Sequence, residues 1–269
     1  MQEEGLKSYL TGLLLGAWRY FDTTGSTNDV ALTWAQTGAP DMALVVADSQ
    51  SAGRGRFQRH WVTNPGAALA FSLVLRPTSV ELQYLSHFAA LGALAIWQTL
   101  AKEWDLAVQI KWPNDILLNQ KKAAGILIEN TWLGDQLQGL VMGVGLNISP
   151  QSVPPPDQLM YPATCLESVL GYAVNRWAVL RSILLNLASW RKQLGSPEFF
   201  NTWEDHLAFK DEWVQVSGTS GPERVGRVAG LSPSGSLRLV DQQGNELLVD
   251  AGDVSLRSAD SGQGSLKRL

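Results

Sequence analysis

The chain has 269 residues, of which 45% are hydrophobic, and its 21 Lys and Arg against 25 Asp and Glu give a formal net charge of −4. This is the composition of a globular protein, long enough for one large and one small domain, and its acidic balance excludes a general attraction to nucleic-acid phosphate. The single cysteine, Cys165, excludes an internal disulfide and favours a reducing compartment such as the cytoplasm. The first residues lack a secretory signal, and the most apolar run, from Phe88, is shorter than the roughly 20 residues of a membrane span.

In chain order, the first half predicts a sheet built from hairpins with helices beside it. A helix is expected to begin at Ser26 or Thr27 and to end at Gly38, and a long helix is expected from about Glu81 to Trp104. A Pro-Asn-Asp turn is expected at 113–115. Strands are predicted at 17–22, 43–49, 67–77, 108–112, 116–118, 123–129 and 137–148.

The second half changes character after a proline-rich loop at 149–158. Two or three helices are expected up to about Lys210, followed by short strands joined by Gly and Ser turns, as in a small β-barrel. The polar residues 258–269 are expected to be disordered. The sequence therefore predicts an α+β fold, with a central mixed or antiparallel sheet flanked by helices in domain 1–211 and a barrel in domain 212–269.

The arginine loop, residues 48–61 with the sequence DSQSAGRGRFQRHW, is the first candidate site. Its glycines let the backbone approach a ligand, and its guanidinium groups suit phosphate or carboxylate. A solvated, mobile basic loop is the alternative, and the composition leaves it open. The loop is not a P-loop, because no G-x-x-x-x-G-K-[ST] pattern occurs.

Three further segments carry groups that suit phosphate chemistry. KWPNDILL, 111–118, places a lysine, an amide and a carboxylate around a turn, and Asp115 is a candidate Mg²⁺ ligand. Lys122 leads into the small residues of KKAAGILIE, and Asn147 follows the apolar run of GVGLNI. Each segment also has a purely conformational explanation, as a turn, an ordinary strand or a strand end.

No G-x-S-x-G or H-E-x-x-H pattern is present, so serine-hydrolase and zinc-protease chemistry are not indicated. Cations and amides without an evident base suit a reaction driven by positioning and by electrostatic stabilisation of phosphate.

Taken in order, STND, SQSAGRGRFQRHW, KWPNDILL, KAAGILIE and GVGLNI resemble the biotin protein ligases, also called biotin–[acetyl-CoA-carboxylase] ligases. The terminal GLSPSGSLRL and GDVSLR resemble the SH3-like C-terminal barrel of that family. The resemblance implies a class II synthetase-like catalytic fold and two reaction steps. Biotin and ATP would first give biotinyl-5′-AMP and pyrophosphate. Biotin would then be transferred to a lysine amine of a biotin carboxyl carrier domain of acetyl-CoA carboxylase.

The resemblance also implies site residues. Lys122, Arg54 and Arg56 would be catalytic, and Asp115 would bind Mg²⁺. Biotin would contact Ser26, Thr27, Asn28, Gln50, Gly53, Arg54, Gly55, Arg56, Lys122 and Gly125. ATP would contact Arg56, Arg59, Trp61, Lys111, Asn114 and Asn147.

The chain departs from the family's common GRGRRGRxW pattern at Phe57 and Gln58, where Arg and Gly are usual. About 17 residues precede the first strand, too few for the DNA-binding domain of some relatives, so no DNA partner is expected. Exposed strands of the sheet are available for a homodimer. A lipoate or octanoate transferase of similar fold is the alternative enzyme, and a non-catalytic biotin-sensing or DNA-binding module is the alternative outside enzymes.

Overall fold

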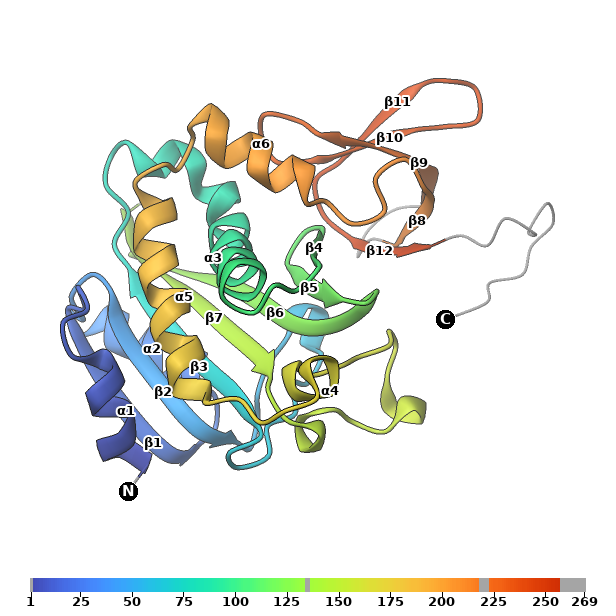
Figure 1. Cartoon of the computed structure of the whole chain (residues 1–269). Coiled ribbons are helices and arrows are strands. Elements are labelled where there is room, and N and C mark those ends of the chain that lie inside the picture. The colour runs from blue at the N-terminus through green and yellow to red at the C-terminus, as the bar shows by residue number, and fades with distance from the viewer. Residues whose placement is uncertain (1, 134–135, 218–222, 257–269) are drawn as a thin grey trace.

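The computed structural model describes residues 2–133, 136–217 and 223–256, so the tail expected to be disordered at 258–269 lies outside the described residues. No helix in this part of the chain is both long enough and apolar enough to cross a membrane. The described residues form a large layered unit, followed in the chain by a smaller β-sheet unit (Figure 1).

The large unit is built on a seven-stranded sheet in the order β1-β2-β3-β7-β6-β5-β4. β1 and β2 are parallel and every other neighbouring pair is antiparallel, which confirms the predicted mixed sheet. The turn predicted at 113–115 lies one residue earlier, at 112–114, because Asp115 already pairs with Lys111 and Gly125 as the first residue of a strand. The strands are β1 Ala17–Thr24, β2 Ala43–Gln50, β3 Ala68–Leu75, β4 Val108–Lys111, β5 Asp115–Leu118, β6 Lys121–Leu133 and β7 Gln136–Asn147.

Helices cover both faces of this sheet. The helices are α1 Gln2–Leu10, α2 Thr27–Gln36, α3 Phe88–Glu103, α4 Leu166–Leu170, α5 Arg176–Arg191 and α6 Pro197–Asp205. On β3, Phe71 and Leu73 join the cluster that contains α3 and α5, whereas Val74 joins a second cluster with Ala31 and Ala35 of α2. Because side chains alternate between the faces of a strand, α2 lies on the face opposite to α3 and α5.

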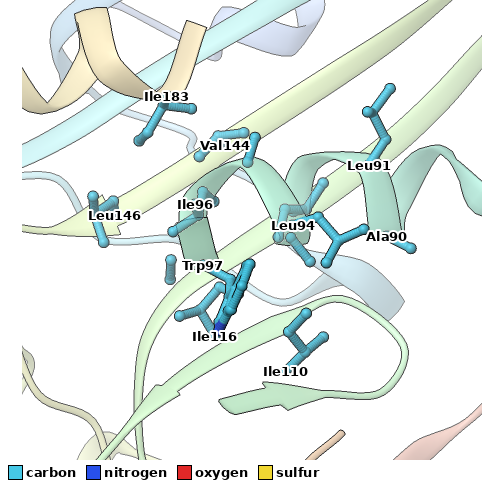
Figure 2. Packing of buried hydrophobic residues seen from close by; sticks show 14 of the residues in the cluster. Ala90, Leu91, Leu94, Ile96, Trp97, Ile110, Ile116, Val144, Leu146 and Ile183 are labelled. Atoms are coloured by element: carbon cyan, nitrogen blue, oxygen red, sulfur yellow. The ribbon is translucent and has the colours of Figure 1, made fainter. Parts of the chain in front are cut away.

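The main core lies between α3 and the sheet. Figure 2 shows Leu94 and Ile96 of α3 beside Val144 and Leu146 of β7, with Ile183 of α5 closing the cluster. All five side chains are at most 4% exposed. Full burial of such a side chain contributes about 1.5–3 kcal/mol, so this layer fixes β7 firmly in the centre of the sheet.

Two further local features of the structure differ from the sequence prediction. The helix predicted from Glu81 to Trp104 is a 3₁₀ segment, Glu81–His87, followed by α3, because Tyr84 leaves the helical region with φ −115° and ψ 23°. The helix α1 was not predicted. It is held by tertiary contacts, since Leu6 is fully buried in the main core.

The smaller unit is a five-stranded antiparallel sheet in the order β11-β10-β9-β8-β12, in agreement with a small SH3-like barrel. Its strands are β8 Trp213–Ser217, β9 Arg224–Leu231, β10 Leu237–Val240, β11 Glu246–Val249 and β12 Asp253–Leu256. The turn between β9 and β10 docks on the large unit, where Trp112 Nε1 donates to the Gly235 carbonyl at 2.9 Å and Ser86 Oγ donates to the Ser234 carbonyl at 2.9 Å. We retain 1–211 and 212–269 as the proposed domains.

Candidate functional site

A cavity of about 470 Å³ lies on the face of the main sheet that carries α2. Gly125, Gly143 and Gly145 line it from β6 and β7, and Gly125 pairs directly with Gly145. A Cβ on Gly145 would overlap the ring of Trp61, and one on Gly143 would overlap the amide of Asn28. Glycines on these strands therefore leave the space that the cavity and its lining side chains occupy.

The segments that the sequence singled out meet around this cavity, although they are far apart in the chain. It is lined by Ser26, Thr27, Asn28, Gln50, Arg54, Gly55, Arg56, Arg59, Trp61, Lys111, Asn114, Asp115, Lys122, Gly125 and Asn147. Gly53 is the one candidate outside the lining. It is buried within the arginine loop itself, where its carbonyl accepts from the Trp61 amide at 2.9 Å. The ligand that each residue contacts stays a prediction.

One end of the cavity is a network of neutral hydrogen-bonding groups at the start of α2. The Thr27 amide and hydroxyl both donate to Gln50 Oε1, at 2.8 and 3.1 Å, in place of a capping bond from the Ser26 side chain. Asn28 accepts from Ser72 at 2.6 Å. Because these buried amides and hydroxyls hold one another, their orientation is fixed before a ligand arrives.

The other end of the cavity is cationic, and Arg56 and Arg59 of the arginine loop supply two of its charges. Arg54 reaches back to α2 and β6, where Nη2 lies 2.6 Å from Asp29 and 2.9 Å from Glu129. Glu129 also accepts from Asn28 Nδ2 at 2.7 Å. A single carboxylate thus links the loop to the neutral end of the cavity.

The C-terminal sheet contributes to this cationic end. Arg56 Nη1 donates to the Gly252 carbonyl at 3.1 Å and to Asn114 Oδ1 at 3.3 Å, and it lies 3.9 Å from Asp253. Arg59 forms an ion pair with the same aspartate. Burial lowers the pKa of Arg56, and Asp253 opposes that shift. The loop is therefore held from two directions, by the large unit and by β12.

Two lysines share one carboxylate deep in the cavity. Asp115 Oδ1 lies 2.7 Å from Lys122 Nζ, and Asp115 Oδ2 lies 3.7 Å from Lys111 Nζ. Burial lowers the pKa of Lys111, with Asp115 as the largest opposing influence. Lys111 also lies 4.4 Å from the ring centroid of Tyr161, whose pKa burial raises to about 12.

The surroundings of Asp115 do not form a preformed metal site. Both of its oxygens face ammonium groups, and within the described ranges no three His, Cys, Asp or Glu side chains gather as potential ligands. Mg²⁺ prefers several oxygen ligands in octahedral geometry and usually takes some of them from substrate phosphates. The structure thus gives Asp115 lysine partners, and its role toward Mg²⁺ stays a prediction.

The sequence did not single out four residues at the cavity. Asp253, Gly143 and Tyr161 line it, and Glu129 is connected to it through its contacts with Arg54 and Asn28. Glu129 and Asp253 pair with the arginines, Gly143 makes room for Asn28, and Tyr161 stacks on Lys111. Asp253 is almost 200 residues from the loop along the chain, so no local pattern connects them. GDVSLR, in which it lies, carried only a resemblance to the barrel.

The model of the biotin/lipoate A/B protein ligase family matches residues 20–147 of this chain. The chain is 33% identical to the bifunctional ligase/repressor BirA of Bacillus spizizenii, over 94% of this chain and 77% of that protein. It is also 33% identical to the biotin–[acetyl-CoA-carboxylase] ligase of Paracoccus denitrificans, over 85% of this chain and 96% of that protein.

Among solved structures, the biotin protein ligase from Aquifex aeolicus in complex with biotin and ATP superposes with a TM-score of 0.77. The two chains are 26% identical, and the match covers 90% of this chain and 98% of that one. The chain therefore belongs to the biotin protein ligases within this family, and it is a ligase enzyme.

Proposed function

We propose that this enzyme joins biotin to a protein lysine in two steps. The biotin carboxylate attacks the α-phosphate of ATP to give biotinyl-5′-AMP and pyrophosphate, and an acceptor lysine amine then attacks the mixed anhydride and releases AMP. The Aquifex aeolicus ligase complex with biotin and ATP supports these substrates. The Paracoccus denitrificans ligase name supports acetyl-CoA carboxylase as the acceptor, and we propose its biotin carboxyl carrier domain as the part modified.

The observation that carries the proposal is the polarity of the cavity. Its neutral end, around Thr27, Asn28 and Gln50, offers fixed donors and acceptors that suit a polar ring such as the biotin ureido group. Its cationic end suits a carboxylate and phosphates. The volume of about 470 Å³ lies in the usual range for small-molecule sites, roughly 300–1,000 Å³.

We assign residue roles along this axis. The aromatic rings of Trp61 and Tyr161 would pack near the adenine base of the nucleotide. The proposed biotin contacts are Ser26, Thr27, Asn28, Gln50, Gly53, Arg54, Gly55, Arg56, Lys122 and Gly125. The proposed nucleotide contacts are Arg56, Arg59, Trp61, Lys111, Asn114 and Asn147.

In this mechanism Lys122 supplies the charge that lets two anions meet. A carboxylate and an α-phosphate repel each other, and an ammonium group between them lowers that cost as charge shifts in the transition state. Arg54 and Arg56 would complete the cationic surface on the loop side. The loop and the segment 152–163, which supplies several lining residues, would shield the reactive anhydride from water.

Three further assignments remain part of the proposal. Mg²⁺ would accompany ATP, with Asp115 as its candidate ligand, and we derive no step of the reaction through it. The edge strand β1 is available for a homodimer. A free, buried Cys165 is compatible with the cytoplasm.

The test is ATP-dependent transfer of biotin onto a purified biotin carboxyl carrier domain, read as the mass gain of the carrier. Parallel reactions contain lipoate in place of biotin, or omit ATP. A biotin-sized gain that requires ATP is expected. A gain with lipoate alone would mean that the pocket selects a different acid, and no gain with either would refute the proposed activity.

A further inference from the structure

Phe57 has an unusual backbone conformation for a bulky residue. It lies in the 3₁₀ turn Arg56–Gln58 of the arginine loop with φ 54° and ψ 42°, in the left-handed region. A Cβ makes that region unfavourable, so glycine and asparagine are the residues that usually occupy it. Phe57 is also 39% exposed, so burial of its ring in the core does not account for its presence.

The ring of Phe57 lies against both phosphate-end arginines of the loop. The Arg56 guanidinium carbon is 4.6 Å from the ring centroid and the Arg59 guanidinium carbon is 5.9 Å from it. Both distances lie within the range in which a ring face attracts a cation. The ring and the Asp253 carboxylate therefore contact the same two guanidinium groups.

Two neighbouring guanidinium groups repel each other, and each long side chain has many rotamers to lose. The Phe57 ring lies within cation–π distance of both guanidinium groups, whereas an arginine at this position would add a further positive charge. The ring thus reduces both the repulsion and the freedom of the pair without neutralising the charge that phosphates need.

We propose that Phe57 is a positioning residue that holds Arg56 and Arg59 side by side for the phosphates of the nucleotide. This inference rests on the proposed function of the cavity. Phe57 acts through the arginines and has no contact with the reacting atoms. An observed backbone outlier at a ligand site is a reason to expect a functional constraint, because the rest of the structure must maintain it.

The experiment compares Phe57→Gly, Phe57→Asn and Phe57→Tyr in the full chain. Gly and Asn suit the left-handed backbone but remove the ring, whereas Tyr keeps both the strain and the ring. The assay is biotin-dependent exchange of pyrophosphate into ATP, with KM measured separately for ATP and biotin. Unfolding in urea shows whether each variant is folded, and Leu248→Asn removes an exposed apolar side chain on β11, outside the cavity, as a matched control.

Loss of the ring should raise the KM for ATP by roughly three- to thirtyfold, because two cation–π contacts are removed. The KM for biotin should rise less than the KM for ATP, because Arg59 is assigned to the nucleotide alone and Arg56 to both ligands. The urea midpoint should not fall, and Phe57→Tyr and Leu248→Asn should behave like the unsubstituted enzyme. An unchanged KM for ATP in the Gly and Asn variants would overturn the inference, as would an equal rise in both KM values. Absence of exchange in the unsubstituted enzyme would instead refute the proposed function.

Discussion

Replacing Asp115 by Asn tests whether this carboxylate holds lysines or a metal ion. The side chains of Lys111 and Asp115 are only 7% and 12% exposed, and the substitution keeps the shape while it removes the charge that faces two ammonium groups. Breaking a buried pair costs about 3–5 kcal/mol. Because Lys122 is 27% exposed and can turn toward water, we expect a loss near the lower end, about 3 kcal/mol.

The pH dependence of that loss has a definite sign. Burial already holds the pKa of Lys111 below its usual value, and removal of Asp115 lowers it further. The unfolded chain then binds a proton to this lysine more readily than the folded chain, so stability rises with pH between the folded and the unfolded pKa. The difference in unfolding free energy between the two proteins should be largest near neutral pH. It should shrink as the pH approaches the unfolded lysine value of about 10.4.

The assay is urea unfolding of both proteins from pH 7 to 10, together with the Mg²⁺ dependence of pyrophosphate exchange at pH 7.5. If Asp115 holds the lysines, the free energy of unfolding of the variant falls, and the Mg²⁺ concentration that gives half-maximal pyrophosphate exchange is unchanged. A Mg²⁺ midpoint raised about tenfold, about 1.4 kcal/mol, with unaltered stability would refute this reasoning and support the metal-ligand assignment.

Three further changes probe the cavity. Lys122→Ala should slow biotin-dependent pyrophosphate release on the order of 100- to 1,000-fold while ATP binding measured by calorimetry changes little, and a rate near that of the unsubstituted enzyme would remove Lys122 from the mechanism. Gly145→Ala should displace the Trp61 ring, destabilise the protein by about 1–3 kcal/mol in urea and weaken ATP binding. Gly5→Ala is its control, since a Cβ there meets only ordinary contacts at 3.8 Å, and equal effects of the two would contradict the packing argument. Asp253→Asn should raise the KM for ATP about fivefold, because the partly exposed ion pairs with the loop contribute on the order of 1 kcal/mol, and an unchanged KM would show that β12 has no part in nucleotide binding.

Local sequence patterns predicted much of the fold. Short, nearly continuous apolar runs predicted β2, β3 and β7, because these strands are buried on both faces of the sheet. The helix α1 was missed because its stability comes from the packing of Leu6 and Leu10 against distant elements. The break at Tyr84 was missed because the residues before α3 are also compatible with helix.

The same distinction between local and distant information applies to the candidate site. The cations and amides lie in short motifs, so the sequence could name them, and the fold brings them to one cavity. Their partners are single residues without a motif of their own. Glu129 is the last residue of a quoted strand, and Asp253 belongs to another sheet, so only the folded chain could show that each contacts the arginine loop.

These partners explain how five positive charges can share one cavity. Four carboxylates lie between the cations and divide them into groups: Arg54 with Asp29 and Glu129, Arg56 and Arg59 with Asp253, and Lys111 and Lys122 with Asp115. Compensation by fixed carboxylates lowers the repulsion that would otherwise drive the loop into solvent, so the donors can be oriented before phosphate arrives. A flexible basic loop would instead pay that ordering cost when it binds. The carboxylates are therefore expected to matter for nucleotide affinity although they share the charge of the ligand, and Asp253→Asn and Asp115→Asn are the substitutions that separate pre-organisation from simple attraction.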